Sequence, residues 1–385
     1  MGSRYLTSRM EQRRFGKTNL NLSVCSLGTM RCLASPQTNR ETIAKAIALG
    51  INHLETARGY GQSETYLGTT LKDLAIPRQN IYLTTKISPT LNKAEVTSQI
   101  EQSLAKLQVD YIDCLAIHGI NTWSHLKSVI ESNGYLAAIE QAMRQGKIRH
   151  LGFSTHGSLD LILAAIKTDL FEFINLHYYY FWQRNAPAIA LAAAKDMGVF
   201  IISPADKGGK LYTPSAKLSE ICQPYTPLGI GYRFLLRDKR ITTISIGAAN
   251  PDELTTPTQL IDTDYALSES EKEVLEKLEQ QLTDSLSTDL CSQCHQCLPC
   301  PETINIPEIL RLRNLTIAYD MKDYGHYRYG MLENAGHWFP GRKGNKCTEC
   351  GDCLLRCPEK LNIPNLLHDT HDILKGKERR RLWSE

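Results

Sequence analysis

The sequence predicts an α/β protein in which a (β/α)8 barrel precedes a smaller, mostly helical, cysteine-rich domain. From about residue 12 to residue 284, short apolar runs rich in β-branched residues alternate with longer amphipathic stretches, as in parallel sheets connected by helices. The alternation occurs eight times. Beyond it the composition changes to cysteine and proline. The 385 residues are enough for a barrel of about 250 residues and an appended domain.

The expected strands are short and apolar, and each is followed by a helical pattern. The strands cover residues 24–28, 51–55, 81–86, 111–118, 150–154, 173–175, 199–203 and 243–246. The helices cover residues 38–49, 63–71, 93–107, 134–145, 159–166, 187–197 and 228–236, and a further helix covers 268–282. Gly50, Gly146 and Gly198 stand between a helical stretch and a strand, where a left-handed residue ends a helix. A doubly wound sheet shows the same alternation, but no G-x-G-x-x-G turn follows the first strand, which favours the barrel.

The bulk composition excludes several classes of protein. With 42% hydrophobic and 22% charged residues, the chain is typical of a soluble globular protein. A net charge of +3 is too balanced for a protein that binds nucleic acid through its phosphates. No apolar run reaches the roughly 18 residues of a membrane span, and the basic residues of the first ten are not followed by the apolar stretch of a secretory signal. We therefore expect a cytoplasmic protein with neither a nucleic-acid partner nor a membrane span.

The cysteine-rich region is expected to form its own domain and contains an internal repeat. An acidic and polar run, 269–289, precedes it, so we expect domains at 12–284 and 285–385. The segment C-P-E-T-I-N-I-P-E-I-L at 300–310 recurs as C-P-E-K-L-N-I-P-N-L-L at 357–367. In each copy an Asn lies two residues before a Pro suited to a first helical turn. A helix should therefore begin near Pro307 and another near Pro364.

Eight of the 12 cysteines fall into two groups with metal-ligand spacing. The first group reads C-x2-C-x2-C-x2-C-P and the second C-x2-C-x2-C-x3-C-P. A secreted disulfide framework would need a small chain and a signal peptide, so clustered thiolates indicate metal in a reducing compartment. Zinc also binds C-x2-C pairs, but it needs four ligands, usually from two separated pairs. Three closely spaced cysteines with a fourth before proline, occurring twice, favour iron–sulfur clusters over zinc.

The two groups closely resemble a bacterial two-cluster ferredoxin. In that family three thiolates of one group bind three corners of a cluster, and the fourth, before proline, binds the other cluster. The resemblance implies one [4Fe–4S] cluster on Cys291, Cys294, Cys297 and Cys357. It implies a second [4Fe–4S] cluster on Cys347, Cys350, Cys353 and Cys300.

Ionisable residues stand at the carboxyl ends of the second, third and fourth expected strands, where barrels place reacting groups. They are Glu55 with Tyr60, Lys86 and His118. The surrounding motifs resemble an aldo-keto reductase over residues 12–283. They are L-E-T-A-R-G-Y-G at 54–61, T-T-K at 84–86, Y-I-D-C-L-A-I-H-G at 111–119 and G-K-I-R-H-L-G-F-S at 146–154. With the cysteine-rich tail, the chain resembles the iron–sulfur branch of that family.

The resemblance implies a catalytic tetrad of Tyr60, Lys86, His118 and Glu55. Free tyrosine, with a pKa of about 10, is a poor acid at neutral pH unless a nearby cation favours its anion, and Lys86 would supply that charge. His118 would orient the carbonyl and share the proton, and the carboxylate of Glu55 would hold the lysine in place. Glu55 stands where the family has Asp, so the site has to accommodate one extra methylene.

The resemblance also implies a nicotinamide site, with several departures from the family pattern. Ser154 and Asn175 take the positions that bind the carboxamide, although Gln is usual at the second. Thr155 replaces the family's Asn, and Ile202 replaces a common aromatic that stacks on the ring.

The phosphates of the dinucleotide are expected on two further segments. Ser203, Gly208 and Gly209 resemble the pyrophosphate loop, where glycine lets backbone N–H groups approach phosphate. Gly247 begins the adenosine-phosphate segment, which carries no Arg or Lys up to Ile261. Charge therefore does not favour NADPH over NADH.

The resemblance implies nicotinamide-dependent reduction of a small carbonyl compound, or oxidation of the alcohol, with clusters that exchange electrons with a redox protein such as ferredoxin. A hydride carries two electrons and a cluster accepts one, so a flavin or quinone intermediary is one option, although the sequence has no flavin fingerprint. Two alternatives stay open. The clusters could be structural or oxygen-sensing, or the barrel could be a non-enzymatic electron-transfer or assembly module with a degenerate cofactor site.

Overall fold

The computed structural model describes residues 10–131, 134–255 and 265–380. The first nine residues, in which no secretory signal is expected, lie outside the described ranges. The chain packs into two compact units. One comprises Met1–Gly209 and Gly231–Ala266, and the other Lys210–Ile230 and Leu267–Glu385.

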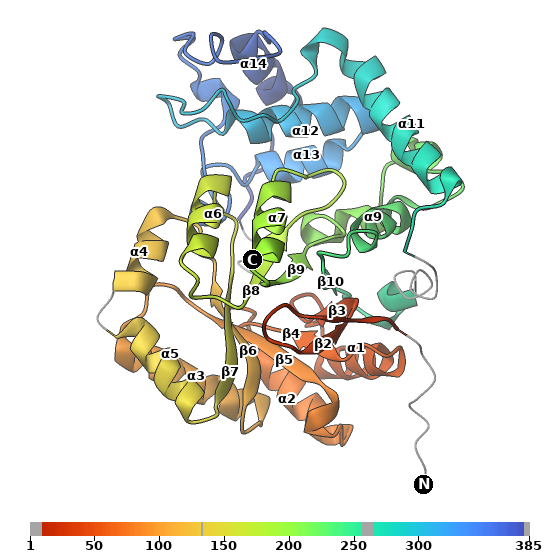
Figure 1. The fold of residues 1–385 in the computed structure, drawn as a ribbon. Helices are drawn as coiled ribbons and strands as arrows, with labels where there is room; N and C mark the ends of the chain where they lie inside the picture. Colours follow the sequence, from red (N-terminus) through yellow and green to blue (C-terminus); the bar gives the residue numbers. More distant parts are fainter. Residues whose placement is uncertain (1–9, 132–133, 256–264, 381–385) are drawn as a thin grey trace. The chain divides into compact units, whose positions relative to one another are not determined.

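The first unit is a closed barrel of eight parallel strands (Figure 1), which confirms the predicted fold class. Each strand pairs with the next along the chain, and the last pairs with the first. The strands are β3 (Cys25–Gly28), β4 (His53–Glu55), β5 (Tyr82–Ile87), β6 (Ile112–His118), β7 (Ile148–Ser154), β8 (Phe173–His177), β9 (Gly198–Ile202) and β10 (Thr243–Ile246). Their ends lie within two residues of the predicted ends.

The predicted helices of the barrel sequence are present. They are α1 (Pro36–Ala48), α2 (Ser63–Asp73), α3 (Lys93–Leu107), α5 (Tyr135–Arg144), α6 (Leu159–Lys167), α7 (Ala186–Ala194) and α9 (Pro227–Leu236). Sequence reasoning missed α4 (Trp123–Glu131), whose Trp123 is largely exposed. It also missed a hairpin before the barrel, formed by β1 (Gln12–Arg14) and β2 (Asn21–Ser23). These strands are too short to show a period of two.

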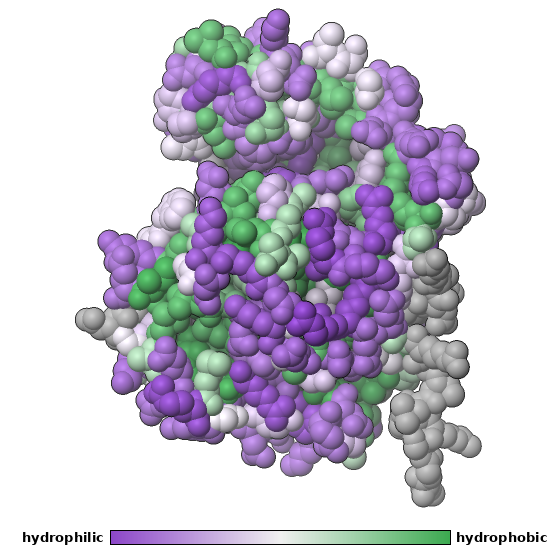
Figure 2. Space-filling model, viewed as in Figure 1, coloured by the Kyte–Doolittle hydropathy of each residue, from purple (hydrophilic) through white to green (hydrophobic). Residues whose placement is uncertain are grey.

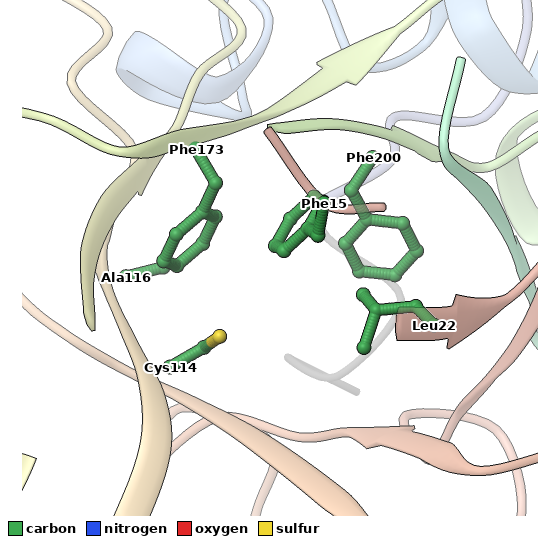
Figure 3. Packing of buried hydrophobic residues seen from close by; sticks show 6 residues of the cluster. All are labelled: Phe15, Leu22, Cys114, Ala116, Phe173 and Phe200. Atoms are coloured by element: carbon green, nitrogen blue, oxygen red, sulfur yellow. The ribbon is translucent and has the colours of Figure 1, made fainter. Parts of the chain in front are cut away.

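The hairpin closes the amino-terminal end of the barrel. Phe15, from its turn, packs against Phe173 at a ring-centroid distance of 5.2 Å, in the buried apolar cluster shown in Figure 3. The turn approaches the start of β9 closely. Gly16 has a φ of +53°, and a Cβ there would collide with the backbone at Met197 and Gly198. Because this end is filled with apolar side chains, chemistry is restricted to the carboxyl ends of the strands.

A buried polar layer lies inside the barrel above this plug. His53 contacts the ring of Phe200 on one side. Its Nδ1 lies 2.7 Å from Ser26 Oγ, and its Nε2 lies 2.7 Å from Thr84 Oγ1. Burial, together with the charge of Lys86, lowers the pKa of His53 to about 3. The ring is therefore neutral, and it serves as a hydrogen-bonding spacer between the plug and the charged end of the barrel.

The second unit is mainly helical, as predicted. Its helices are α8 (Ala216–Ile221), α11 (Glu269–Leu286), α12 (Ile306–Tyr319), α13 (Lys322–Tyr329) and α14 (Ile363–Leu374). The predicted helix starts near Pro307 and Pro364 are confirmed, because α12 and α14 each carry that proline in the first turn. Asn305 caps α12, with its side chain accepting a hydrogen bond from the N–H of Glu308.

The second unit includes a segment that interrupts the barrel sequence, Lys210–Ile230. Ser215 Oγ in this segment donates a hydrogen bond to the carbonyl of Tyr319 at 2.6 Å. Tyr225 Oη lies 2.6 Å from Ser270 Oγ of α11. Packing thus divides the chain differently from composition, and the boundary expected at 284/285 from composition stays a prediction.

The surface is predominantly polar on the face shown in Figure 2, where hydrophilic side chains surround scattered apolar patches. Across the described ranges, no helix has both the length and the apolar character needed to cross a bilayer.

Candidate functional site

The four predicted catalytic side chains meet at the carboxyl end of the barrel. Lys86 Nζ donates a hydrogen bond to Tyr60 Oη at 3.1 Å and forms an ion pair with Glu55. It also donates to the carbonyl of Thr56 at 2.9 Å. The ring of Tyr60 stands edge-on to that of His118, with centroids 5.6 Å apart. All but His118 are at most 9% exposed, so their charges interact with little screening by water.

The register of the barrel explains why residues far apart in the sequence converge here. Glu55 pairs with Thr84 across β4 and β5, and His118 pairs with Ser154 across β6 and β7. Each therefore lies at the same rim. Tyr60 is carried by the loop after β4, which is anchored because the N–H of Arg58 donates to the carbonyl of Lys86 at 3.3 Å.

Glu55 faces a glycine on the neighbouring strand. Gly28 pairs with Glu55 across β3 and β4. A Cβ at Gly28 would lie 3.4 Å from Glu55 Oε2 and 2.5 Å from Ser245 Oγ. The missing side chain at Gly28 therefore makes room for the Ser245 hydroxyl, while Glu55 lies beside that position and reaches Lys86.

The expected carboxamide site contains one buried side chain that lacks its hydrogen-bond partners. Asn175 is completely buried on β8, and among the described residues neither its Oδ1 nor its Nδ2 finds a hydrogen-bond partner. It pairs with Ser154, whose Oγ accepts a hydrogen bond from the N–H of Gly119 at 3.0 Å. An unsatisfied buried amide costs about 1–3 kcal/mol. A carboxamide, with one acceptor and one donor group, is the complementary partner, so the residues present fit a nicotinamide.

The expected pyrophosphate loop has the backbone conformation of a tight turn. Ser203 and Gly209 have φ values of +55° and +70°. The N–H of Gly209 donates to the carbonyl of Asp206 at 3.0 Å, and the side chain of Asp206 accepts a hydrogen bond from Tyr179 Oη at 2.6 Å. Gly208 lies in the 3-10 helix η2 (Lys207–Tyr212), and its surroundings are outside the described part of the chain.

Sequence reasoning missed a cation at the expected adenosine-phosphate segment. The guanidinium of Arg31, in the loop after β3, donates to the carbonyl of Gly247 at 2.7 Å. It also forms a bidentate ion pair with Glu253, at 2.6 and 3.1 Å. Glu253 in turn accepts a hydrogen bond from the N–H of Ala249. No local motif could have revealed Arg31, because the contact spans 216 residues; its charge is balanced by Glu253.

A pair of histidines beyond the carboxamide residues was also missed. The rings of His156 and His177 lie 4.4 Å apart between centroids. The second also contacts the ring of Trp182 at 5.3 Å. His156 follows β7 and His177 ends β8, so both histidines lie at the same rim as the tetrad. Isolated histidines without ligand spacing give no signal in a sequence.

In the second unit, one pocket is lined by cysteines from both groups. The first group contributes one cysteine and the second group three, and Ile304, Ile306 and Leu367 form apolar walls. The four cysteines are Cys300, Cys347, Cys350 and Cys353. The set is the same as the one that the ferredoxin resemblance implies for the second cluster.

The remaining cysteines also interact across the groups. Burial raises the pKa of the Cys291 thiol, and the nearby Cys294 and Cys357 raise it further. Burial and the neighbouring Cys291 and Cys294 raise the pKa of Cys297 to about 12. In the described residues, no three His, Cys, Asp or Glu side chains are grouped closely enough for a single metal ion. The chemistry and spacing of these donors fit clusters better than mononuclear zinc.

Comparison with known proteins identifies both parts of the chain. The model of the aldo/keto reductase family matches residues 25–279, and that of the 4Fe-4S dicluster domain matches residues 290–361. The chain therefore belongs to the aldo/keto reductase family, which is a family of oxidoreductases. It also carries an iron–sulfur dicluster domain.

Individual relatives are distant. Methylglyoxal reductase DkgB of Salmonella typhi is 29% identical over 131 residues, which are 33% of this chain and 47% of that protein. The uncharacterized oxidoreductase YqkF of Bacillus subtilis is 26% identical over 55% of this chain and 70% of its own length. L-galactose dehydrogenase of Arabidopsis thaliana is 28% identical over 51% of this chain and 65% of its own. This chain thus spans about half the length of the Salmonella enzyme.

A solved structure shares the barrel fold. The holo form of aldo-keto reductase AKR11C1 from Bacillus halodurans superposes with a TM-score of 0.61 at 23% identity, over 70% of this chain and 96% of that one. At this identity the likeness establishes the fold alone.

Proposed function

We propose that the protein reduces a carbonyl group of a small molecule with NADPH or NADH, or oxidises the corresponding alcohol, at the carboxyl end of the barrel. The observation that carries this proposal is the buried contact of the Lys86 ammonium with both Tyr60 Oη and the carboxylate of Glu55. Such a contact positions a phenol to give up a proton to a developing alkoxide.

Each member of the tetrad has a distinct task. Tyr60 donates its proton to the carbonyl oxygen, and the adjacent ammonium of Lys86 stabilises the negative charge left on the phenol oxygen. Glu55 keeps the buried ammonium charged and in place, since an unpaired charge at this depth is costly. His118, edge-on to Tyr60, orients the carbonyl. A nicotinamide, when bound, would supply the hydride.

The unsatisfied amide of Asn175 supports the proposed binding of a nicotinamide, and Ser154 lies beside it on the paired strand. Ser203, Gly208 and Gly209 would hold the pyrophosphate, and the segment from Gly247 the adenosine phosphate. The Arg31–Glu253 ion pair offers no net charge there, so either dinucleotide is compatible with the site.

We further propose that the dicluster domain holds two [4Fe–4S] clusters that exchange electrons with a redox protein such as ferredoxin. The shared pocket supports the second set of ligands, Cys300, Cys347, Cys350 and Cys353. The ferredoxin-like spacing supports the first set, Cys291, Cys294, Cys297 and Cys357. Clusters carry single electrons, so exchange with a hydride would need an intermediary, such as a flavin or quinone, that accepts two electrons together and passes them on one at a time.

Substitution of the proton donor tests the barrel chemistry. Tyr60→Phe should lower kcat for carbonyl reduction at least about 100-fold, the usual contribution of a general acid, and leave the Kd of NADPH or NADH nearly unchanged. Tyr82→Phe is the matched control, because Tyr82 begins the strand that carries Lys86 and lies away from the site. Retained turnover in Tyr60→Phe would refute the assigned role.

A further inference from the structure

A single arginine connects the two cysteine groups. Arg356 immediately precedes Cys357, and its Nη2 donates to the carbonyls of Cys297 at 3.1 Å and Pro299 at 2.8 Å. Its Nε donates to the carbonyl of Asp352 at 3.0 Å. One guanidinium thus connects the loop of the first group to the loop of the second.

The two groups are not equivalent at this position. Three residues, Leu354, Leu355 and Arg356, separate the last two cysteines of the second group, whereas only Leu298 and Pro299 separate those of the first. The repeat therefore has an arginine in one copy and no counterpart in the other. The hydrogen bond to a sulfur of the first group comes from a neutral amide, since Gln293 Nε2 donates to Cys291 Sγ at 3.3 Å.

Arg356 also lines the pocket formed by Cys300, Cys347, Cys350 and Cys353. The other charged side chains of that lining are Glu302 and Asp352. Glu302 is paired with Arg342 at 2.9 Å, and Asp352 is exposed. The three hydrogen bonds of Arg356 all go to neutral carbonyl oxygens, so none of these partners neutralises its positive charge.

We propose that Arg356 is a positioning residue that makes the two cluster sites unequal. It holds the two cysteine loops together. Its side chain lines the pocket of Cys300, Cys347, Cys350 and Cys353, whereas its contact with the other set is to the backbone carbonyl of Cys297, so its charge raises the reduction potential of the cluster in that pocket more than that of the other cluster. This inference rests on the proposed cluster function. Reduction adds one electron, and hence one negative charge, to a cluster already surrounded by thiolates, so an adjacent cation favours the reduced state.

The consequence is an ordered pair of electron sites. The first electron that enters the domain occupies the cluster beside Arg356, and the second occupies the cluster held by Cys291, Cys294, Cys297 and Cys357. Any offset by Asp352 is present with or without Arg356, so the effect of removing the arginine keeps its sign. The protein would thus have one cluster that stays reduced longer and one that passes its electron on more readily.

The test measures reduction potentials of the anaerobically prepared, full-length protein with dithionite as reductant, and follows the clusters by electron paramagnetic resonance. The wild type should show two separate one-electron steps. In Arg356→Gln the higher potential should fall markedly more than the lower one. Lys375→Gln is the control, because it removes one positive charge from an exposed side chain paired with Asp372 and should leave both potentials unchanged.

A second variant separates charge from shape. Arg356→Lys keeps the charge but cannot make the forked hydrogen bonds, so it should restore the higher potential while lowering the thermal midpoint of the domain. Unchanged potentials in Arg356→Gln, or an equal fall in Arg356→Lys and Arg356→Gln, would overturn the electrostatic role. If Arg356→Gln does not load iron, Arg356→Lys is compared with the wild type. An unchanged higher potential then supports the role of the charge, and a fall of that potential overturns it. A wild-type protein without iron and sulfide would instead refute the proposed cluster function, which is a separate result.

Discussion

The two candidate sites of this protein are assembled in different ways. In the barrel, Glu55, Lys86 and His118 come from three strands, and their meeting depends on the register of a closed sheet. In the dicluster domain, the cysteines lie in two short loops, and Cys300 of the first group lines one pocket with three cysteines of the second. Secondary structure preorganises the barrel site. The cysteine site depends instead on the local spacing of its ligands and on metal binding. Variants should therefore affect the two regions independently.

The largest effect is expected from removal of one cluster ligand. Cys350→Ala should reduce iron from about eight to about four atoms per chain, because one [4Fe–4S] site loses a corner. The Kd of NADPH or NADH should not change, since the barrel strands contain none of these cysteines. Iron and sulfide analysis and a fluorescence titration measure the two quantities.

Thr348→Ala is the matched control, because Thr348 lines the same pocket without offering a thiolate. A loss of dinucleotide affinity in Cys350→Ala alone would contradict the independence of the two regions. The chain itself could transmit such an effect from one region to the other. Lys210–Ile230 packs in the second unit and directly follows Gly209 of the proposed pyrophosphate loop.

A smaller effect, with opposite signs in two measurements, is expected at Asn175. Asn175→Leu replaces an unsatisfied buried amide by an apolar group of similar size, so thermal stability should be unchanged or higher. The same change should weaken dinucleotide binding about 10-fold, equivalent to about 1.4 kcal/mol, the scale of one or two lost hydrogen bonds.

Asn185→Leu provides the comparison, because Asn185 is also buried but its Nδ2 donates to the carbonyl of His177 at 2.9 Å. That variant should lose stability. If Asn175→Leu is destabilising to the same degree and binds the dinucleotide as the wild type does, Asn175 is a structural residue.

The smallest expected effect concerns the polar layer inside the barrel. The pKa of His53 in the folded protein is lowered to about 3 from its ordinary value of 6.5. Below pH 6.5 the unfolded chain binds a proton that the folded barrel does not accept until about pH 3, so stability falls as the pH decreases through this window. Between pH 7.5 and 5.5 this amounts to about 1 kcal/mol.

Thermal midpoints of the wild type and of His53→Gln, recorded at both pH values, measure this contribution. The variant should lose less stability on acidification than the wild type does. An identical pH dependence in the two proteins would mean that folding does not lower the pKa of His53.

Much of the fold was accessible from the sequence because the signals are local. Alternating apolar runs and glycine stops predicted all eight barrel strands, and the Asn-Ile-Pro repeats predicted the starts of α12 and α14. The tetrad was found through a family resemblance, and the family is confirmed; the roles of Tyr60, Lys86, His118 and Glu55 stay predictions. The β1–β2 hairpin was missed because its strands are only three residues long. Helix α4 was missed because the barrel pattern requires one helix after β6, and α5 supplies it.

The sequence by itself determined the kinds of element, the two cysteine groups and the chemical character of the residues at the strand ends, because periodicity, spacing and side-chain chemistry are properties of neighbouring residues. The tertiary structure decided which distant residues meet. It brought Arg31 to Gly247, placed Gly28 opposite Glu55, left the amide of Asn175 without partners among the described residues and placed Cys300 with the second group. These contacts depend on closure of the barrel and on helix packing, in which residues far apart in sequence are selected by geometry and burial.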